Sequence, residues 1–238
     1  DFVKTQKWKD KVVDDLRNGI GNLCRLNGVE IIQGEGFFQS SDKLSVETAT
    51  GMRTIEFESA IIATGTRVKE IEELKFDHKK ILSSDDIFKL TELPKKMIVV
   101  GGGYIAVEMT HLFLKLGSKV TTVHRGERLL KKMEPEITGM LHKKIGELGG
   151  EILLNAKILD AKNGIAKIKT PEGEKRVEFD AILIAAGREV CLDNLKLENT
   201  KVSLNEEGFV IVDDKLRTTD PKIYAVGDII PGPQLAHN

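Results

Sequence analysis

The hydrophobic positions of this chain change their period twice between residues 97 and 124. Residues 97–100 form a continuous apolar run of strand length, residues 105–116 carry an apolar stripe at helical spacing, and residues 119–124 return to a strand-like pattern. Gly117 ends the helical stretch. The pattern therefore predicts one complete unit in which two parallel strands flank a crossover helix.

Glycines occupy the turn between the first of these strands and the helix. In the run Gly101-Gly102-Gly103-Tyr104-Ile105-Ala106, Gly101 permits a tight turn and Gly103 removes the Cβ that would block a phosphate. The small Ala106 lets the helix approach the strand, and the free N–H groups at the helix start face an anion. Glycine motifs also occur in purely structural turns, but the position of this one inside a strand–helix–strand unit predicts a dinucleotide site.

The end of the second strand indicates which nucleotide binds. An acidic residue about 20 positions after the glycines would bind the ribose 2′-hydroxyl of NAD, whereas a cation accommodates the 2′-phosphate of NADP. The chain has His124 and Arg125 here, followed by Arg128, Lys131 and Lys132. This favours NADPH over NADH, because an arginine fork binds a phosphate dianion well. A solvated basic loop, partly neutralised by neighbouring glutamates, is the alternative.

The remaining pattern predicts one long helix and a strand-rich region. Residues 5–26 carry Trp8, Leu16 and other apolar residues at helical spacing before Asn27-Gly28, and we expect that face to pack in a core. Short strands are expected over 29–38, 43–49 and 53–57. A charged connector over 66–94 contains a domain boundary, 135–148 predicts a helix, and 151–185 predicts several strands.

Three apolar strands end in small residues. They close on Thr64-Gly65, on Gly187-Arg188 and on Gly227-Asp228. Such ends let a backbone or a ligand come close, and a carboxylate such as that of Asp228 can accept hydrogen bonds from sugar hydroxyls. A plain tight turn and, for Asp228, a helix N-cap are the alternatives.

Composition narrows the class of partner. The 238 residues contain 36 Lys and Arg against 37 Asp and Glu, so the chain lacks the basic field that binds nucleic acid or anionic membranes. No apolar run approaches the about 18 residues of a membrane span, which favours a cytoplasmic location. Cys24 and Cys191 lack metal or redox spacing, so we expect buried thiols and no metal site. The absence of an initiator Met leads us to expect a fragment.

The motifs at 63–65, 101–106, 186–188 and 227–228 resemble, in order and spacing, those of the FAD-dependent pyridine nucleotide-disulfide oxidoreductases. Within that family the opening helix and the end of the chain look most similar to dihydrolipoyl dehydrogenases, with glutathione-reductase-like NADPH features around Tyr104 and Arg125. The resemblance implies an α/β fold in which a Rossmann-like NAD(P)-binding domain is inserted in a partial FAD-binding domain. The implied boundaries are 67–187 for the former, and 1–66 with 188–238 for the latter.

The resemblance also implies site residues. Positions that match flavin contacts are Gly36, Thr64, Gly65, Asp228, Gln234, Leu235, Ala236 and His237, with Asp228 on the ribitol. Positions that match contacts of the nicotinamide nucleotide are Gly101, Gly102, Gly103, Tyr104, Ile105, Ala106, Glu108, His124, Arg125, Ile158 and Gly187. Tyr104 matches a residue that covers the flavin, Glu108 one that lies near it, and Arg188 an arginine at the junction of the two domains.

The implied function is electron transfer between NAD(P)H, FAD and a dithiol or disulfide, free or on a lipoyl domain, in a homodimer. The sequence lacks the first glycine fingerprint, the redox cysteine pair and the acid-base histidine of such enzymes. We therefore predict no catalytic residue and expect the chain alone to be inactive. The alternatives are a glutathione-reductase-like NADPH enzyme, an NADH oxidase-like or nitrite-reductase-like flavoprotein, a non-catalytic nucleotide-binding module, and a truncated relic.

Overall fold

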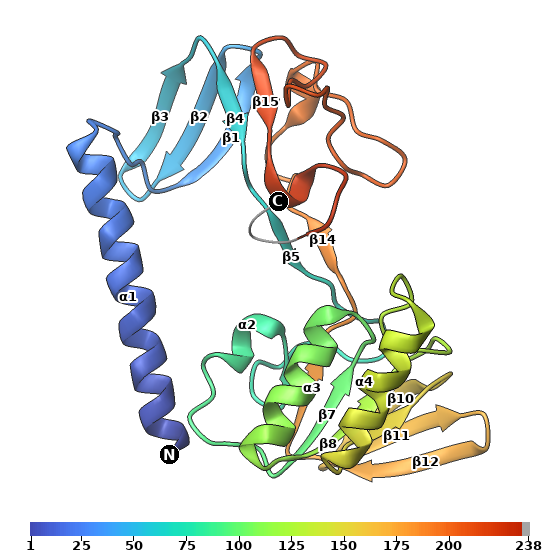
Figure 1. Cartoon of the computed structure of the whole chain (residues 1–238). Coiled ribbons are helices and arrows are strands. Elements are labelled where there is room, and N and C mark those ends of the chain that lie inside the picture. Colours follow the sequence, from blue (N-terminus) through green and yellow to red (C-terminus); the bar gives the residue numbers. More distant parts are fainter. Residues whose placement is uncertain (235–238) are drawn as a thin grey trace. The chain divides into compact units, whose positions relative to one another are not determined.

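The computed structural model describes residues 1–234, which divide into two compact units. Asp1–Asp15 and Val68–Gly187 make up one, here called the inserted unit, and Leu16–Arg67 with the chain from Arg188 onward make up the other, the outer unit. The chain passes from one unit to the other within α1 (Phe2–Leu26), in β5 (Thr66–Val68) and at the start of β14 (Arg188–Val190). β5 and β14 pair as a two-stranded sheet (Figure 1).

A five-stranded parallel sheet lies at the centre of the inserted unit. In spatial order its strands are β6 (Ile81–Leu82), β13 (Ala181–Ile184), β7 (Lys96–Val100), β8 (Lys119–Val123) and β9 (Glu151–Leu153). From β7 the chain moves outward to β8 and β9, and it later returns to the opposite side of β7 as β13. The strand order therefore reverses between β7 and β13, and open α/β sheets bind ligands at the carboxyl ends of the strands beside such a reversal.

Side chains of this sheet alternate between two hydrophobic layers. Met97 and Val99 pack on the face covered by α3 (Tyr104–Leu116) and α4 (Pro135–Glu147). Ile98 packs on the other face, against an antiparallel sheet of three strands. These strands, labelled in Figure 1, are β10 (Lys157–Lys162), β11 (Ile165–Thr170) and β12 (Gly173–Glu178). Because both faces are covered, β7 reads as a continuous apolar run rather than an alternating one.

The connector before β7 contains a short helix with a complete cap. α2 (Ser84–Ile87) begins at Ser83, whose hydroxyl accepts a hydrogen bond from the Asp86 N–H while the Asp86 carboxylate accepts one from the Ser83 N–H. This reciprocal pairing satisfies two backbone donors that the helix itself cannot pair.

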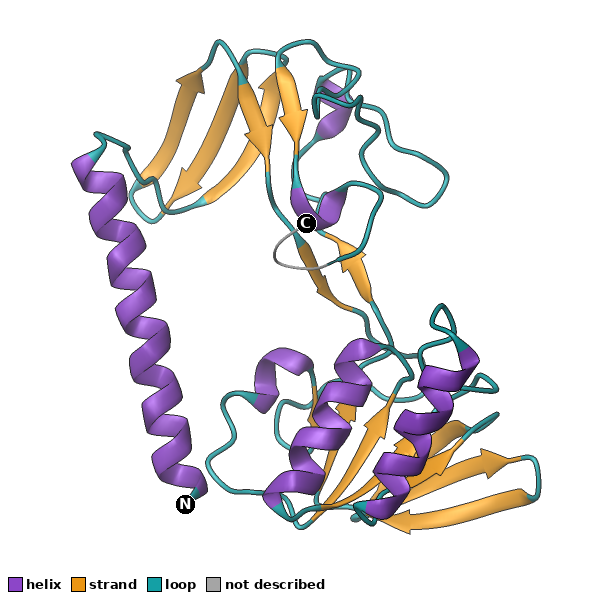
Figure 2. Ribbon diagram, viewed as in Figure 1, coloured by secondary structure: helices purple, strands orange, loops and turns teal. Residues whose placement is uncertain are grey.

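The outer unit is built mainly from strands and turns. β1 (Glu35–Ser40), β2 (Lys43–Thr48) and β3 (Gly51–Glu56) form an antiparallel sheet, and β4 (Ala60–Ile62) pairs in parallel with β15 (Ile223–Ala225). Two turns of 3₁₀ helix follow, η1 (Leu197–Asn199) after β14 and η2 (Gly227–Ile229) after β15. Irregular chain makes up much of the stretch between β14 and β15 (Figure 2). The buried hydrophobic core of the outer unit contains Phe38, Ile62, Leu192, Val210, Ile223, Ala225 and Ile229.

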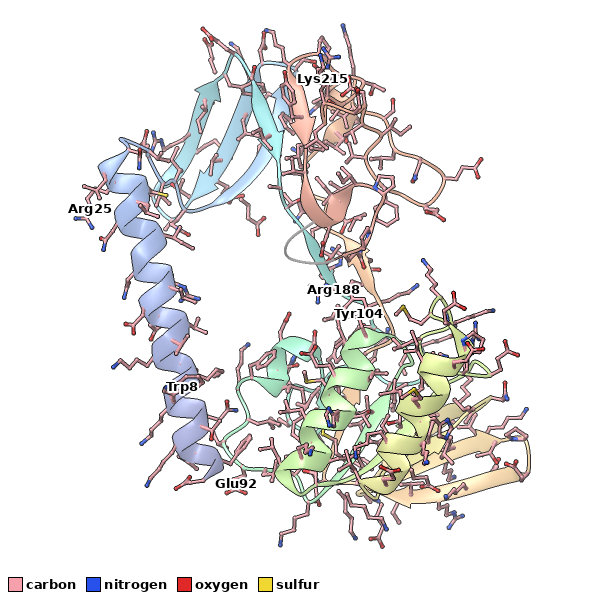
Figure 3. The ribbon with its side chains drawn as sticks, in the orientation of Figure 1. Trp8, Arg25, Glu92, Tyr104, Arg188 and Lys215 are labelled. Carbon is pink, nitrogen blue, oxygen red and sulfur yellow. The ribbon has the colours of Figure 1, made fainter. Side chains whose placement is uncertain are left out.

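The long helix forms where the pattern predicts it, as α1 (Phe2–Leu26), but its predicted core packing is wrong. None of its residues is buried, and Trp8 (Figure 3) and Leu16 are 68% and 65% exposed. Within the described residues it is tied to the inserted unit by polar contacts, in which Gln6 donates to the Leu90 carbonyl at 2.7 Å and Lys9 to that of Phe88. In the part of the chain that the structure describes, the apolar face of α1 does not pack against a hydrophobic core, so the helical periodicity alone overestimates its burial.

Cys24 and Cys191 are free thiols of intermediate exposure, so the prediction that both are buried is also wrong. Among residues 1–234, no helix has the length and apolarity needed to cross a membrane.

Candidate functional site

The glycine turn lies where the strand order of the parallel sheet reverses. Gly101 follows β7 with φ of 143°, a backbone conformation that L side chains rarely adopt. A Cβ on Gly101 would stand 2.2 Å from the carbonyl oxygen of Ala185, just past β13, and 3.3 Å from the Cβ of Ala106. Ala106 is itself fully buried in α3. Gly101 therefore has no room for a side chain, and Ala106 has little room for a larger one where α3 approaches the end of β7.

Gly103 has the opposite environment. It is the N-cap of α3, with ordinary extended φ and ψ of −84° and −177°, and no side-chain hydrogen bond caps the helix there. No atom lies within 4 Å of a Cβ built at this position. The space beside the helix start is open, and the N-terminal end of the helix carries the positive end of its dipole. This donor set and this space fit a pyrophosphate group.

His124 fills a gap between two other glycines. A Cβ on Gly102 would lie 2.5 Å from the ring Nδ1, and one on Gly126 would lie 2.6 Å from Nε2. Burial lowers the pKa of His124, the charge of Arg125 lowers it further, and a hydrogen bond with the Arg128 backbone partly offsets them. The lowered pKa favours the neutral imidazole, and the ring lies close against both Gly102 and Gly126.

The basic loop is tied to the glycine turn by its backbone. The Leu130 N–H donates to the Gly102 carbonyl at 2.7 Å. Arg125 is exposed, whereas Arg128 is half-buried and donates to the Lys131 carbonyl at 2.7 Å, with its Nε buried and unpaired. The guanidinium groups of Arg125 and Arg128 thus follow β8, and they are the cations closest in sequence to His124.

The other candidates for the nicotinamide nucleotide differ in access. Tyr104 is 45% exposed at the start of α3 (Figure 3), and Glu108 is exposed one turn later. Ile105 is half-buried against the helix-side core. Gly187 has φ of 123° and open space around a built Cβ. Ile158 instead is 2% exposed, and its side chain packs in the core beneath the sheet, so the structure does not bring it into the glycine turn.

The candidates for the flavin lie in the outer unit. Thr64 is exposed, and Gly65 and Gly227 have φ of 64° and 76° with open space around a built Cβ. Gly36, in β1, is half-buried; a Cβ there would make only ordinary contact with Leu44, at 3.7 Å, so its own neighbours do not require a glycine. Asp228 lies in η2, after β15. Gln234 is the last described residue, and Leu235, Ala236 and His237 lie outside the described residues.

Sequence reasoning missed Thr66. Its hydroxyl donates to Asp228 Oδ2 at 3.2 Å, and its oxygens accept two hydrogen bonds from Arg188 at 2.7 Å. These partners are 162 and 122 positions away in the chain. A single threonine after a glycine carries no pattern that could reveal such contacts.

Together these features define a class of protein. A parallel sheet carries a glycine turn at its reversal, and it is inserted into a second unit whose strand ends present small residues and a carboxylate. This is the architecture of oxidoreductases built on dinucleotide-binding domains. The model of the pyridine nucleotide-disulphide oxidoreductase family matches residues 2–238, and the chain belongs to this family.

Individual relatives agree with this assignment. The chain is 36% identical over 241 residues to a dihydrolipoyl dehydrogenase of Geobacillus stearothermophilus and 38% identical over 240 residues to one of Staphylococcus aureus. It covers 51% of each of these proteins, so it spans about half the length of the curated relatives it matches.

Solved structures show the same likeness. The HOCl-induced flavoprotein disulfide reductase RclA of Escherichia coli superposes with a TM-score of 0.89 at 29% identity, covering 100% of this chain and 54% of that protein. A Cu(II) complex of RclA gives a TM-score of 0.91. The predicted family and the predicted α/β architecture with two dinucleotide-binding domains are therefore confirmed.

Proposed function

We propose that this chain is part of a flavoprotein that transfers electrons between NAD(P)H, FAD and a dithiol or disulfide, in the manner of a dihydrolipoyl dehydrogenase. The observation that carries the proposal is the glycine turn where the strand order of the parallel sheet reverses. There the backbone of Gly101 packs closely against that of Ala185, and Gly103 faces open space. The similarity to dihydrolipoyl dehydrogenases over the whole chain supports the choice of substrate class.

The two nucleotides would meet different hydrogen-bonding groups, donors for NAD(P)H and an acceptor for the flavin. The N–H groups at the start of α3 would hold the pyrophosphate of NAD(P)H, and the positive end of the helix dipole would favour its charge. In the outer unit, the Asp228 carboxylate would accept hydrogen bonds from the flavin ribitol, and Gly65 and Gly227 leave room for a close approach. Both sets fit the groups they are proposed to bind.

The residues of this chain act by binding and orientation. The bound nicotinamide and flavin would supply the redox chemistry, while backbone donors fix the nucleotide so that little orientational freedom remains to be lost during reaction. Tyr104 and Glu108 are proposed to lie near the flavin, as the family resemblance implies. We propose that the redox dithiol comes from outside this sequence, since Cys24 and Cys191 are separate free thiols.

Anaerobic titration of the complete protein tests the function. We expect NAD(P)H to bleach the flavin absorbance, and lipoamide or its reduced form to exchange electrons with the flavin in steady-state assays. Glutathione disulfide as the preferred substrate would favour the reductase alternative, and oxygen as the only acceptor would favour the NADH oxidase alternative. The 238-residue chain alone should show no turnover of NAD(P)H with lipoamide, and turnover by it would contradict our expectation.

Preference for NADPH is a separate part of the proposal. Position 124, where an acid would be expected to bind the NAD ribose, is a histidine, and the exposed guanidinium of Arg125 follows it. Charge-assisted hydrogen bonds contribute roughly 1.5 to 3 kcal/mol each. Arg125→Glu should therefore lower the ratio of NADPH to NADH affinity at least about tenfold. Arg176→Glu, the same charge change at an exposed position of β12, is the matched control and should leave the ratio unchanged.

An unaltered ratio in the Arg125 variant would refute the NADPH preference without affecting the family assignment. A homodimer formed through a region outside this sequence, and a cytoplasmic location, complete the proposal. Light scattering of the complete protein and cell fractionation test these two parts.

A further inference from the structure

Three side chains of the outer unit are joined by hydrogen bonds that run in one direction. Arg188, on β14 (Figure 3), donates from Nε to the hydroxyl of Thr66 and from a terminal nitrogen to the Thr66 carbonyl, both at 2.7 Å. The Thr66 hydroxyl in turn donates to Asp228 Oδ2 at 3.2 Å. The chain of bonds thus links β14, β5 and η2 through one threonine.

The direction of these bonds follows from the chemistry of the groups. A guanidinium offers only donors, an ionised carboxylate offers only acceptors, and a hydroxyl offers one hydrogen. Because Nε of Arg188 must donate to the Thr66 oxygen, the hydroxyl hydrogen of Thr66 is left to point at Asp228. A threonine hydroxyl that could otherwise rotate is therefore held in one orientation.

The orientation of the Asp228 carboxylate decides which hydrogen bonds it can accept from a ligand. Its backbone lies in a single turn of 3₁₀ helix that is anchored by the fully buried Ile229 and by the hydrogen bond from the Val226 N–H to the Ile62 carbonyl. The carboxylate itself is half-buried. Its bond to Thr66 is longer than the usual 2.7–2.8 Å for such pairs, so the carboxylate is aimed but keeps room to adjust to a ligand.

We propose that Thr66 is a positioning residue of the flavin site: held by Arg188, it fixes one oxygen of Asp228 so that the other accepts a sugar hydroxyl of the flavin. This inference rests on the proposed function. It also gives Arg188 a role different from a direct cofactor contact, since its guanidinium acts through Thr66. Neither the family match nor the relatives' names assign such a role to Thr66.

Flavin affinity of the complete protein, measured by fluorescence during titration of the apoprotein with FAD, tests the proposal. Thr66→Val keeps the shape and removes the hydroxyl, and it should raise the dissociation constant for FAD roughly tenfold, because bonds to a charged acceptor are the stronger ones. Thr66→Ser keeps the hydroxyl and should stay within about twofold of the wild type.

Thr200→Val is the matched control. Thr200 is also half-buried in the outer unit, donates to the Leu197 carbonyl and accepts from the Val202 N–H, and has no bond to Asp228. This variant should lower the urea midpoint of unfolding yet leave FAD affinity within about twofold. An equal loss of flavin affinity in the Thr66 and Thr200 variants would mean that Thr66 is merely structural, which would overturn the proposal.

A double-mutant cycle separates the two roles of Arg188. If Arg188 acts through Thr66, Arg188→Met combined with Thr66→Val should bind FAD about as well as the weaker of the two single variants. If instead the loss of FAD affinity in the double variant equals the product of the two single losses, Arg188 contacts the cofactor directly. A wild-type protein that fails to bind FAD at all would refute the proposed function itself, whereas normal FAD binding by both wild type and Thr66→Val would refute only this inference.

Discussion

Replacing Gly103 by alanine places a methyl group in open space beside the start of α3, whereas the same change at Gly101 drives it into the backbone after β13. At Gly101 the new Cβ would lie 2.2 Å from the Ala185 oxygen, and φ of 143° is strained for any L residue. Backbone strain of this kind costs about 1 to 3 kcal/mol before the clash is counted. We therefore expect Gly101→Ala to lose roughly 3 kcal/mol or more of stability.

The same substitution at Gly103 should cost less stability than at Gly101. Its φ of −84° and ψ of −177° suit alanine, and no atom lies within 4 Å of the added carbon. Alanine is a poorer N-cap than glycine, so the expected loss is about 1 kcal/mol or less. The methyl group would nevertheless occupy the space proposed for the pyrophosphate, and we expect NAD(P)H affinity to fall at least about tenfold.

Two measurements on the complete protein distinguish these outcomes. Urea unfolding reports the stability of each variant, and titration with NAD(P)H reports affinity at a denaturant-free condition where the variant is folded. Normal nucleotide affinity in Gly103→Ala would show that the pyrophosphate does not lie over this turn, which would remove the observation that carries the proposed function. Unchanged stability in Gly101→Ala would refute the packing argument at the sheet reversal.

Two pH effects follow from the half-buried His124 and the buried Asp220. Burial first, and then Arg125, lower the pKa of His124 in the folded state, so the unfolded chain takes up a proton at a higher pH and stability should fall as the pH drops below about 6.5. His124→Gln should remove this part of the pH dependence of stability, measured by urea unfolding at several pH values. An unchanged pH dependence in this variant would contradict the prediction. Burial alone would raise the pKa of Asp220, but hydrogen bonds from Ser41 and from the N–H groups of Lys201 and Lys222 hold it below its usual range. The outer unit should therefore lose stability as the pH falls below about 4, and Asp220→Asn should flatten that loss, which acid titration of the circular dichroism signal would detect.

The parts of the fold that could be predicted from sequence are those with strong local patterns. The strand at 96–100, the glycine turn and α3 form one continuous stretch, and burial on both faces of the sheet makes its apolar signal unmistakable. The predicted strand over 29–38 begins only at Glu35, because Val29 and Ile31 are more than half exposed and do not join the sheet. An apolar pattern at the end of an element marks surface as readily as core.

The remaining features depend on contacts between distant segments. The stripe on α1 shows which residues share a helix face but not what covers them. The ring of His124 serves the glycine turn by packing against Gly102 and Gly126, which no spacing rule encodes. Thr66 gains its partners from β14 and η2, which lie more than a hundred positions away in the sequence. Local periodicity carries no information about such pairings.

The paired strands β5 and β14 bring the two ends of the inserted stretch together. The Lys69 N–H donates to the Gly187 carbonyl at 3.1 Å, and the Cys191 N–H donates to the Gly65 carbonyl at 3.0 Å. Lengthening a closed loop costs only about 0.6 kcal/mol for each doubling of its length, so residues 68–187 can be accommodated at little entropic expense. A gene could therefore gain, lose or exchange residues 68–187 at the junction of β5 and β14 without redesigning these two strands, and the contacts of Gln6 and Lys9 with this stretch would change with it.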